Sequence, residues 1–472
     1  MFSNGELLKG SPVRGSLWRP WDLHVHTPYS IVQHYGGITK WDKYLEDLEA
    51  LPNGTVLGIN DYLLVDGLER LLAERQNGRL ANIAALFPVI ELRLSNLVGT
   101  KNHLSKINAH VIFAETITPS EINGQFLTAL SAKAHLNPED PAECSWTGVI
   151  SRENLEEFGK LIKQSVPDAQ KADYNKSDLE TGFNGLAIPI ETVEAALGHA
   201  RFVGNAILAV GKAEWESMAW NAQSGVLKST LMNQAHLVFG AAPDVETHNR
   251  GRERLVDAGV NSRLVHASDA HYFSVSEEER RIGQSLTWVN TDPTFTGLLH
   301  AVTEFDHRFF TGDEPPQIQS LRRRPSSYIR QLTVRKLTDD SSSHEFFNIA
   351  LDLNPGFVAI VGNKGQGKSA LLDIIGLFAG SRNSEHFTFL NAKRFLHPIE
   401  NPGSHYEGEI SWFSGDSMEA MRLDKGVQAD SVEQVTYLPQ RLIDTICSSD
   451  PEAVEAQKFS HCLLYTSPSP RD

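Results

Sequence analysis

The segment WDLHVHTPYS begins at Trp21 and places two histidines, His24 and His26, one residue apart. Alternating apolar positions from Trp21 to Val25 predict a short strand. Side chains at i and i+2 of a strand project from the same face, so two imidazoles at a strand end can bind one metal ion together. Two surface or packed histidines are the alternative, and the pair alone does not decide between these interpretations.

Carboxylates and further histidines stand at or near the ends of other apolar segments, namely Asp61, Glu91, His110, Asp269 and His271. In an α/β barrel the strand ends converge on one face, where active sites are built. Imidazoles and carboxylates together suit Zn²⁺, Mn²⁺ or Fe²⁺, and a carboxylate such as Glu91 can bridge two ions. The set predicts a site for divalent metal, which would polarise a phosphoryl group and lower the pKa of bound water.

Two members of this set have structural alternatives. An aspartate that follows a strand often caps the next helix, which is the alternative for Asp61. A single histidine inside an apolar segment, such as His110, is often a packed core residue whose hydrogen bonds are satisfied.

The segments DLHVHT, DYLLVDGL and SDAH, together with Glu91 and His110, resemble the PHP (polymerase and histidinol phosphatase) superfamily in order and spacing. The resemblance covers residues 21–272 and implies a distorted (βα)7 barrel whose metal cluster hydrolyses phosphoesters. It also implies ligands for three metal positions: His24, His26, Glu91 and Asp269 for one, Glu91 and His110 for a second, and His271 near a third.

The sequence departs from that family's pattern in two places. The family usually has Asp-His where Asp61 and Tyr62 stand here, and that histidine serves the third metal. The histidine that usually follows His26 by a few residues is replaced by Val32, although His34 is near. We therefore expect about two bound ions rather than a full trinuclear cluster.

The remaining histidine of the second metal has three candidates, His199, His236 and His266. Lys212 follows an apolar strand pattern, and Arg263 precedes another. A cation beside a reacting phosphoryl group stabilises the charge that develops on it, so we expect Lys212 or Arg263 to act in catalysis.

A second motif, GNKGQGKS, fits the phosphate-binding pattern G-x-x-x-x-G-K-[ST] and consists of Gly362, Asn363, Lys364, Gly365, Gln366, Gly367, Lys368 and Ser369. The apolar run FVAIV before it predicts a strand, and SALLDIIGLFAG after it predicts a helix. In that context backbone N–H groups cradle phosphates. We expect Lys368 to reach the β- and γ-phosphates of ATP and Ser369 to ligate Mg²⁺. A glycine-rich turn with an exposed lysine is the alternative.

Gln440, at the end of VTYLPQ, resembles the Q-loop glutamine of ABC-type and SMC-like ATPases; an ordinary strand-end glutamine is the alternative. The two halves together resemble the TrlF-type PHP–ATPases, large bacterial proteins of which some are placed near DNA-repair or phage-defence functions. This resemblance implies a phosphodiesterase or nuclease acting on nucleic acid. An ATP-binding head would control it and would form a homodimer in the full-length protein. A small-molecule or nucleotide phosphatase and a non-catalytic PHP binding module are the alternatives.

The bulk composition limits the class of protein. The chain has 472 residues, three cysteines and a formal net charge of −16. This charge argues against a broad basic surface that coats nucleic acid, but not against nucleic acid as a substrate, because bound divalent metals add positive charge. No apolar run is long enough for a membrane span, and irregularly spaced cysteines argue against a disulfide framework. We expect a cytoplasmic protein without a membrane partner.

Helical and strand patterns alternate, which predicts an α/β fold with a parallel sheet or barrel. The resemblances to the PHP superfamily and to SMC-like ATPases imply the finer fold, a distorted (βα)7 barrel followed by the N-terminal part of an ABC/SMC-like P-loop ATPase head. The final segment, CLLYTSPSPRD, resembles the in-frame translation of a sequencing adapter, so we expect the native sequence to continue beyond His461. The expected parts are a lead-in (1–20), the PHP domain (21–311, with an insertion at about 116–185), a linker (312–328), a partial ATPase domain (329–461) and the adapter segment (462–472).

Overall fold

The computed structural model describes residues 14–100, 103–130, 132–136, 145–218, 225–337, 348–428 and 431–448. The chain divides into two compact units between Pro315 and Pro316, inside the segment predicted as a linker. Among the described residues no helix is both long and apolar enough to cross a membrane. The expected adapter segment and the first part of the lead-in lie outside the described residues.

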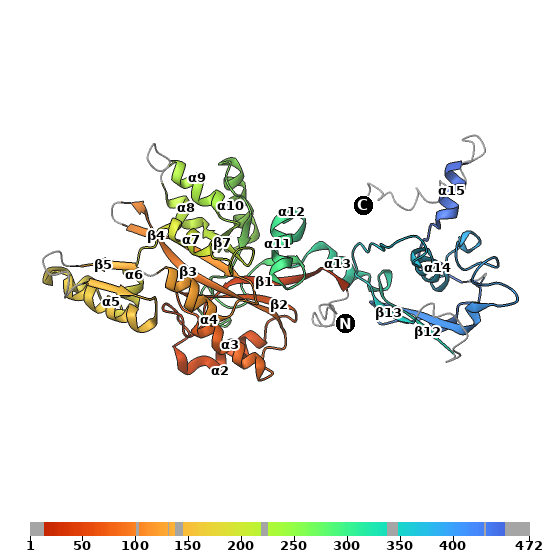
Figure 1. The fold of residues 1–472 in the computed structure, drawn as a ribbon, viewed down its shortest axis with the longest axis horizontal. Coiled ribbons are helices and arrows are strands. Elements are labelled where there is room, and N and C mark those ends of the chain that lie inside the picture. Colours follow the sequence, from red (N-terminus) through yellow and green to blue (C-terminus); the bar gives the residue numbers. More distant parts are fainter. Residues whose placement is uncertain are drawn as a thin grey trace. The chain divides into compact units, whose positions relative to one another are not determined.

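A nine-stranded sheet in the order β11-β10-β1-β2-β3-β4-β7-β8-β9 forms the centre of the first unit (Figure 1). β1, β2 and β3 are parallel, β4 is antiparallel to both its neighbours, and β7, β8 and β9 are parallel again. The strands are β1 Leu17–Val25, β2 Thr55–Tyr62, β3 Ile83–Thr100, β4 His103–Phe113, β7 Ala206–Gly211, β8 Leu237–Gly240, β9 Leu264–His266, β10 Thr287–Thr291 and β11 Phe309–Thr311.

The sheet is nearly closed into a barrel. Ala270, just after β9, accepts a hydrogen bond from His26 N at 3.0 Å and donates one to His24 O at 3.1 Å. These bonds join the end of the strand series to β1, so the strand ends from β1 round to β9 surround one space. The sequence prediction of an α/β, barrel-like fold is confirmed at this level.

Helices pack around the outside of this sheet; in the view of Figure 1, α2 and α3 lie below it and α8, α9 and α10 lie above it. Trp41, Tyr44, Leu45 and Leu48 of α2 are buried at helical spacing and pack against apolar side chains of β1 and β2. The helices outside the insertion are η2 Ile38–Lys40, α2 Trp41–Glu49, α3 Asp66–Gln76, α7 Ile190–Leu197, α8 Lys212–Ser217, α9 Gly225–Gln234, α10 Val245–Asp257, α11 Phe295–Thr303 and α12 Phe305–Arg308.

One run of helical sequence pattern does not form a single helix. The run from Trp215 to Gln234 has a helical pattern throughout, but α8 ends at Ser217 because Met218 has an extended backbone (φ −73°, ψ 128°). α9 then begins at Gly225. Residues 219–224 between them lie outside the described part of the chain.

The predicted insertion forms helices and a separate antiparallel pair, β5 with β6, rather than strands of the main sheet. Phe183 of α6 packs against Tyr62 of β2, with ring centroids 4.8 Å apart. The insertion therefore contacts the barrel at the end of β2. Its elements are α4 Pro119–Glu121, the π-helix η3 Ile122–Leu127, β5 Ala132–His135, β6 Ser145–Gly148, α5 Arg152–Ser165, η4 Asp168–Asp173 and α6 Asp178–Gly185.

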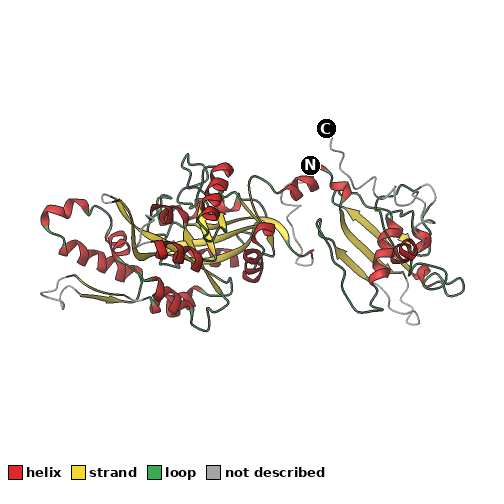
Figure 2. Ribbon diagram, turned by 90° about the horizontal axis from the view of Figure 1, so that it is seen from above, coloured by secondary structure: helices red, strands yellow, loops and turns green. Residues whose placement is uncertain are grey.

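The second unit contains a four-stranded antiparallel sheet in the order β13-β12-β14-β15, with α14 packed against it (Figure 2). Ile374 and Phe378 of α14 share a core with Leu332, Val334 and Ile410 of the sheet. The elements are α13 Pro316–Arg323, η5 Pro325–Ser327, β12 Ile329–Lys336, β13 Ile349–Asp352, α14 Lys368–Phe378, η6 Ser384–His386, η7 Pro402–His405, β14 Tyr406–Trp412, β15 Met421–Arg422 and α15 Gln440–Ser448.

Asp373 of α14 is fully buried and accepts hydrogen bonds from Phe389 N at 2.7 Å, Leu390 N at 3.3 Å and Tyr437 Oη at 2.8 Å. Asp373→Ala leaves these donors without their acceptor, so we expect the free energy of unfolding of the second unit to fall by about 2–4 kcal/mol. Unfolding in denaturant, monitored by hydrogen exchange, measures the stability of the second unit separately from that of the first. Asp416→Ala, at an exposed position, is the control; equal stability of the two variants would contradict the prediction.

Candidate metal centre and phosphate-binding loop

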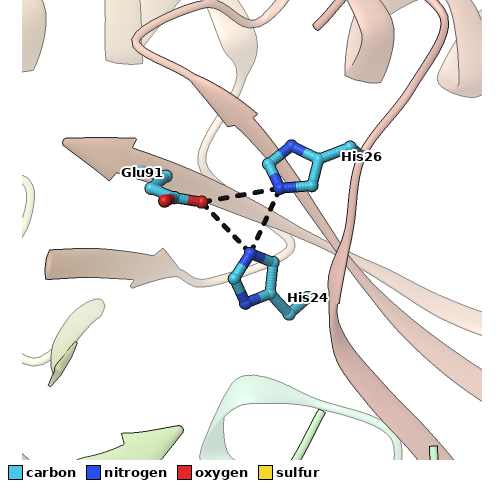
Figure 3. Close-up of side chains that lie close together, drawn as sticks. All are labelled: His24, His26 and Glu91. Carbon is cyan, nitrogen blue, oxygen red and sulfur yellow. Dashed lines mark hydrogen bonds and ion pairs between the residues drawn. The ribbon is translucent and has the colours of Figure 1, made fainter. Parts of the chain in front are cut away.

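The carboxyl end of β1 brings His24 and His26 together. Their Nε2 atoms are 3.2 Å apart, and Glu91 Oε2 from the neighbouring part of the barrel lies 3.1 Å from His24 Nε2 and 3.5 Å from His26 Nε2. Figure 3 shows the three side chains converging on one point. The paired histidines therefore face a carboxylate, as the sequence pattern predicts.

Asp269 and His271 complete the cluster from the segment after β9. Asp269 Oδ1 lies 3.0 Å from His24 Nε2 and 3.1 Å from His271 Nε2. The backbone of Asp269 is left-handed, with φ at 48°, a conformation that aspartate adopts more readily than most residues. This conformation turns the carboxylate toward β1, and backbone strain of this kind occurs often at functional sites.

The ligand atoms lie in a buried and strongly charged setting. Burial alone would lower the pKa of His24, but Asp269 and Glu91 raise this pKa to about 10. Burial and the neighbouring His271 hold the pKa of His26 well below its usual value. Burial would raise the pKa of Asp269, but His24 and the other imidazoles bring it well below the usual range. Two carboxylates among buried imidazoles therefore favour a cation in the cluster.

The hydrogen bonds around the ligands fit metal coordination. His271 Nδ1 is 3.2 Å from Val32 O and donates to it, which leaves Nε2 as the unprotonated nitrogen. This Nε2 is buried, and although Asp269 Oδ1 lies 3.1 Å from it, the two atoms do not have the geometry of a hydrogen bond. His26 Nδ1 lies 3.1 Å from Ser30 Oγ, which leaves its Nε2 facing the cluster. Metal-binding histidines characteristically use their second nitrogen in this way.

Within the described residues two sets of three ligands have their donor atoms within 4.8 Å of one another: His24, His26 and Glu91, and His26, Asp269 and His271. These buried groups could hold a metal ion. Imidazole nitrogens with carboxylate oxygens suit Zn²⁺, Mn²⁺ or Fe²⁺.

His110 of β4 lies beside the cluster but is not part of either set. Its Nδ1 is 3.8 Å from Glu91 Oε2, and the Asn60 amide Nδ2 lies 3.0 Å from that oxygen and 3.2 Å from His110 Nδ1. Burial lowers the pKa of His110 to about 3. The structure thus places an amide between the two residues that the family resemblance assigns to a second metal.

Asp61, which was predicted as a metal ligand, belongs to neither of the two ligand sets found among the described residues. Asp61 lies inside β2, and its two carboxylate oxygens accept hydrogen bonds from Thr27 N at 2.8 Å and Thr27 Oγ1 at 2.6 Å. Burial raises the pKa of Asp61 to about 6, although these hydrogen bonds oppose the rise. Asp61 therefore positions the residue after His26 and does not cap a helix.

Tyr62 occupies the position where the resemblance expects a histidine. Its ring stacks on His26, with centroids 4.7 Å apart, and it is buried. Side chains alternate between the two faces of β2. Asn60 and Tyr62 are on the face that is turned toward the ligands, and Asp61 is on the opposite face. This alternation is the signal by which the sequence could have identified Asn60.

Neither of the two residues predicted to stabilise the phosphoryl charge makes a side-chain hydrogen bond or ion pair with the candidate ligands in the described part of the chain. Lys212 Nζ pairs with Glu216 Oε2 at 2.7 Å, and its side chain lies between β8 and α10. Arg263 is exposed and precedes the first residue of β9, whereas Asp269 follows the last. The amino and carboxyl ends of parallel strands lie on opposite edges of the sheet. Arg263 is therefore on the edge of the barrel opposite to Asp269.

The three histidines considered as ligands of a second metal are either exposed or hydrogen-bonded to the backbone. His199 is exposed, and His236 Nδ1 accepts a hydrogen bond from Leu208 N at 3.3 Å. His266 Nε2 bonds to Ala242 O at 2.8 Å, and its Nδ1 accepts from Leu286 N at 3.2 Å. None of them belongs to the metal-ligand sets found among the described residues.

In the second unit, the loop Gly362–Ser369 leads directly into α14. Gly365 and Gly367 have φ values of 87° and 85°, which glycine adopts without strain. Lys368 opens the helix, and its Nζ donates to Gly362 O at 2.6 Å and Asn363 O at 2.8 Å. The ammonium group of Lys368 therefore lies inside the glycine-rich loop and is bonded to two of its carbonyl groups.

The strand predicted before this loop is absent from the described residues. Residues 357–361 have no strand assignment, and Phe357 and Val361 are 93% and 87% exposed. An extended apolar segment becomes a strand only beside a partner, and none lies next to it in the described part of the chain. Gln440 begins α15, so the alternative of an ordinary strand-end glutamine does not apply to it.

Comparison with known proteins adds no identification. No model of a protein family matches the chain, and no curated protein matches it in sequence.

Proposed function

We propose that the first unit is a metal-dependent phosphoesterase, with a phosphodiester of nucleic acid as its substrate. The convergence of His24, His26, Glu91 and Asp269 on one point carries this proposal. A divalent ion held by these residues would polarise a phosphoryl oxygen and lower the pKa of a water molecule. The order and spacing of the motifs that resemble the PHP superfamily support the same reaction.

The protein's own backbone and side-chain groups prepare the site for this reaction. Val32 O and Ser30 Oγ fix the ring orientation of His271 and His26, so little reorganisation is needed when a ligand binds. The rings of Tyr62 and Phe183 form an apolar wall beside His26, which excludes water from that side of the cluster.

The test is direct. The purified chain is expected to contain tightly bound Mn²⁺, Zn²⁺ or Fe²⁺ by elemental analysis and to cleave bis(p-nitrophenyl) phosphate and single-stranded DNA in Mn²⁺. A chain that binds no divalent metal would contradict the proposal and favour a non-catalytic binding module. Metal without cleavage would show that the cluster is not sufficient for hydrolysis.

A phosphatase acting on a small phosphoester is the second candidate. It is favoured by the enclosure of the cluster, since the side chains of His24, His26, Glu91 and His271 are at most 9% exposed and only Asp269 reaches 25%. A comparison of p-nitrophenyl phosphate with its bis-ester distinguishes the two: preference for the monoester would favour the phosphatase.

We further propose that the second unit binds MgATP and controls the first. The loop geometry of Gly362–Ser369 supports this, because its glycines permit the backbone to turn toward phosphates at the start of α14. This unit would form a homodimer, as the resemblance to SMC-like heads implies.

Lys368→Ala removes the ammonium group that the loop encloses. We expect the affinity for a fluorescent ATP analogue to fall at least about 10-fold, because charge-assisted bonds to the phosphates are lost. Lys393→Ala, at an exposed position in the same unit, is the control. Equal affinity of the Lys368→Ala variant and the unchanged protein would exclude a phosphate-binding role for this loop.

A further inference from the structure

Arg280 lies at the outer oxygen of Asp269. Its Nη1 is 3.3 Å from Asp269 Oδ2, whereas Oδ1 of the same carboxylate faces His24 and His271. The guanidinium group therefore stands next to the cluster, on the side of Asp269 that is turned away from the imidazoles. The side chain is 51% exposed, so a molecule from solution can reach it.

The backbone of Arg280 is tied to the segment that carries the ligands. Its carbonyl accepts hydrogen bonds from His271 N at 2.9 Å and from Tyr272 N at 3.1 Å. These bonds fix the Cα position of Arg280 relative to the metal centre. A guanidinium group has five N–H donors, and in the described residues the group donates one side-chain hydrogen bond, to Asp269.

Arg280 also lines a cavity of about 500 Å³ beside the metal centre. Ala242 after β8, Ser268 after β9 and Arg281 line the same cavity, and so do three acidic residues, Glu277, Glu278 and Glu279. Ala242 and Ser268 follow the carboxyl ends of β8 and β9, which is the edge of the barrel where Asp269 and His271 lie. The volume is within the range of small-ligand sites. Arg280 is thus shared between the cluster and a cavity that can receive a substrate.

We propose that Arg280 binds the non-bridging oxygens of the substrate's phosphoryl group and that the adjoining cavity receives part of the same substrate. This inference rests on the proposed phosphoesterase function. The planar guanidinium fork pairs with phosphate through two parallel hydrogen bonds. Its position beside Asp269 supplies the cation that neither Lys212 nor Arg263 provides.

The experiment measures binding of inorganic phosphate to the full chain loaded with Mn²⁺, by calorimetry, with metal content determined on the same samples. Arg280→Gln is expected to weaken phosphate binding by about 10- to 100-fold while the metal content stays unchanged. Arg280→Lys keeps the positive charge but lacks the planar guanidinium group. Its phosphate affinity is expected to lie between those of the unchanged protein and Arg280→Gln. Arg281→Gln is the matched control, because Arg281 lines the same cavity but its Nη1 donates to Glu278 O at 2.7 Å.

Equal phosphate affinity of the unchanged protein and Arg280→Gln would overturn the proposal, and so would an equal loss in Arg281→Gln. Loss of metal together with phosphate would also overturn it, because Arg280 would then act by positioning Asp269. If the unchanged protein cleaves phosphoesters and Arg280→Gln binds phosphate normally, only the role of Arg280 fails. If the metal-loaded protein neither binds phosphate nor cleaves a phosphoester, the proposed function fails as well.

Discussion

His24→Ala is expected to abolish metal binding and phosphoester cleavage together. His24 Nε2 is the atom that faces Glu91, Asp269 and His26 at once, at distances of 3.0 to 3.2 Å. Changing only the hydrogen-bonding partners of metal ligands costs about 10- to 100-fold in metal affinity, so removing a central ligand is expected to cost at least about 100-fold. Elemental analysis and the rate of bis(p-nitrophenyl) phosphate cleavage measure both effects on one preparation.

A control is needed because His24 is buried and its loss leaves two carboxylates without their nearest cation. Circular dichroism and the thermal midpoint show whether the variant still folds. His300→Ala is the matched substitution, since His300 is exposed on α11 and alanine favours a helix. A folded His24→Ala variant with unchanged metal content and cleavage rate would place the reaction somewhere other than this cluster.

Gly159→Ala is expected to have the largest effect on stability in the first unit. A Cβ at Gly159 of α5 would lie 1.8 Å from Asp178 O, and one at Gly182 of α6 would lie 1.9 Å from Leu155 O. Both contacts are with backbone, which cannot rotate away, so the two helices must separate. We expect a loss of about 1–3 kcal/mol in the free energy of unfolding, or more. Urea denaturation gives the magnitude, and hydrogen exchange over 152–185 locates it.

Gly124→Ala is the control for this substitution, because a Cβ at Gly124 meets no atom within 4 Å and the residue lies in the π-helix η3. It is expected to be neutral or to stabilise by less than about 1 kcal/mol. Gly159→Ala combined with Gly182→Ala is expected to cost less than the sum of the two, since the first change already separates the helices. A Gly159→Ala variant as stable as the unchanged protein would show that α5 and α6 do not pack this closely.

The α5–α6 contact also reaches the metal centre. Phe183 of α6 packs on Tyr62, and Tyr62 stacks on His26. Loosening the helix pair is therefore expected to move the apolar wall beside the cluster. A fall in cleavage rate of Gly159→Ala with unchanged metal content would be the sign of this connection.

The local pattern of the sequence was sufficient for those features that depend on neighbouring residues. The i and i+2 spacing placed His24 and His26 on one face of β1, because alternation is a property of any extended strand. The spacing of glycines in Gly362–Ser369 likewise indicated a loop before a helix, since positive φ angles there suit glycine. The choice of Asp269 relied on its position after a strand end, which convergence in a barrel turns into proximity. Glu91 was chosen in the same way, but the structure places it in the middle of the long strand β3.

Only the tertiary structure decided which polar residues meet. Asp61 and Asn60 are adjacent in sequence, yet one bonds to Thr27 and the other to Glu91 and His110, because alternate residues of β2 point to different neighbours. Arg280 reaches Asp269 because backbone bonds hold its loop against His271, a pairing without any local signature. Contacts across the fold depend on register and strand polarity, so they follow from the whole chain and not from the spacing of any one segment.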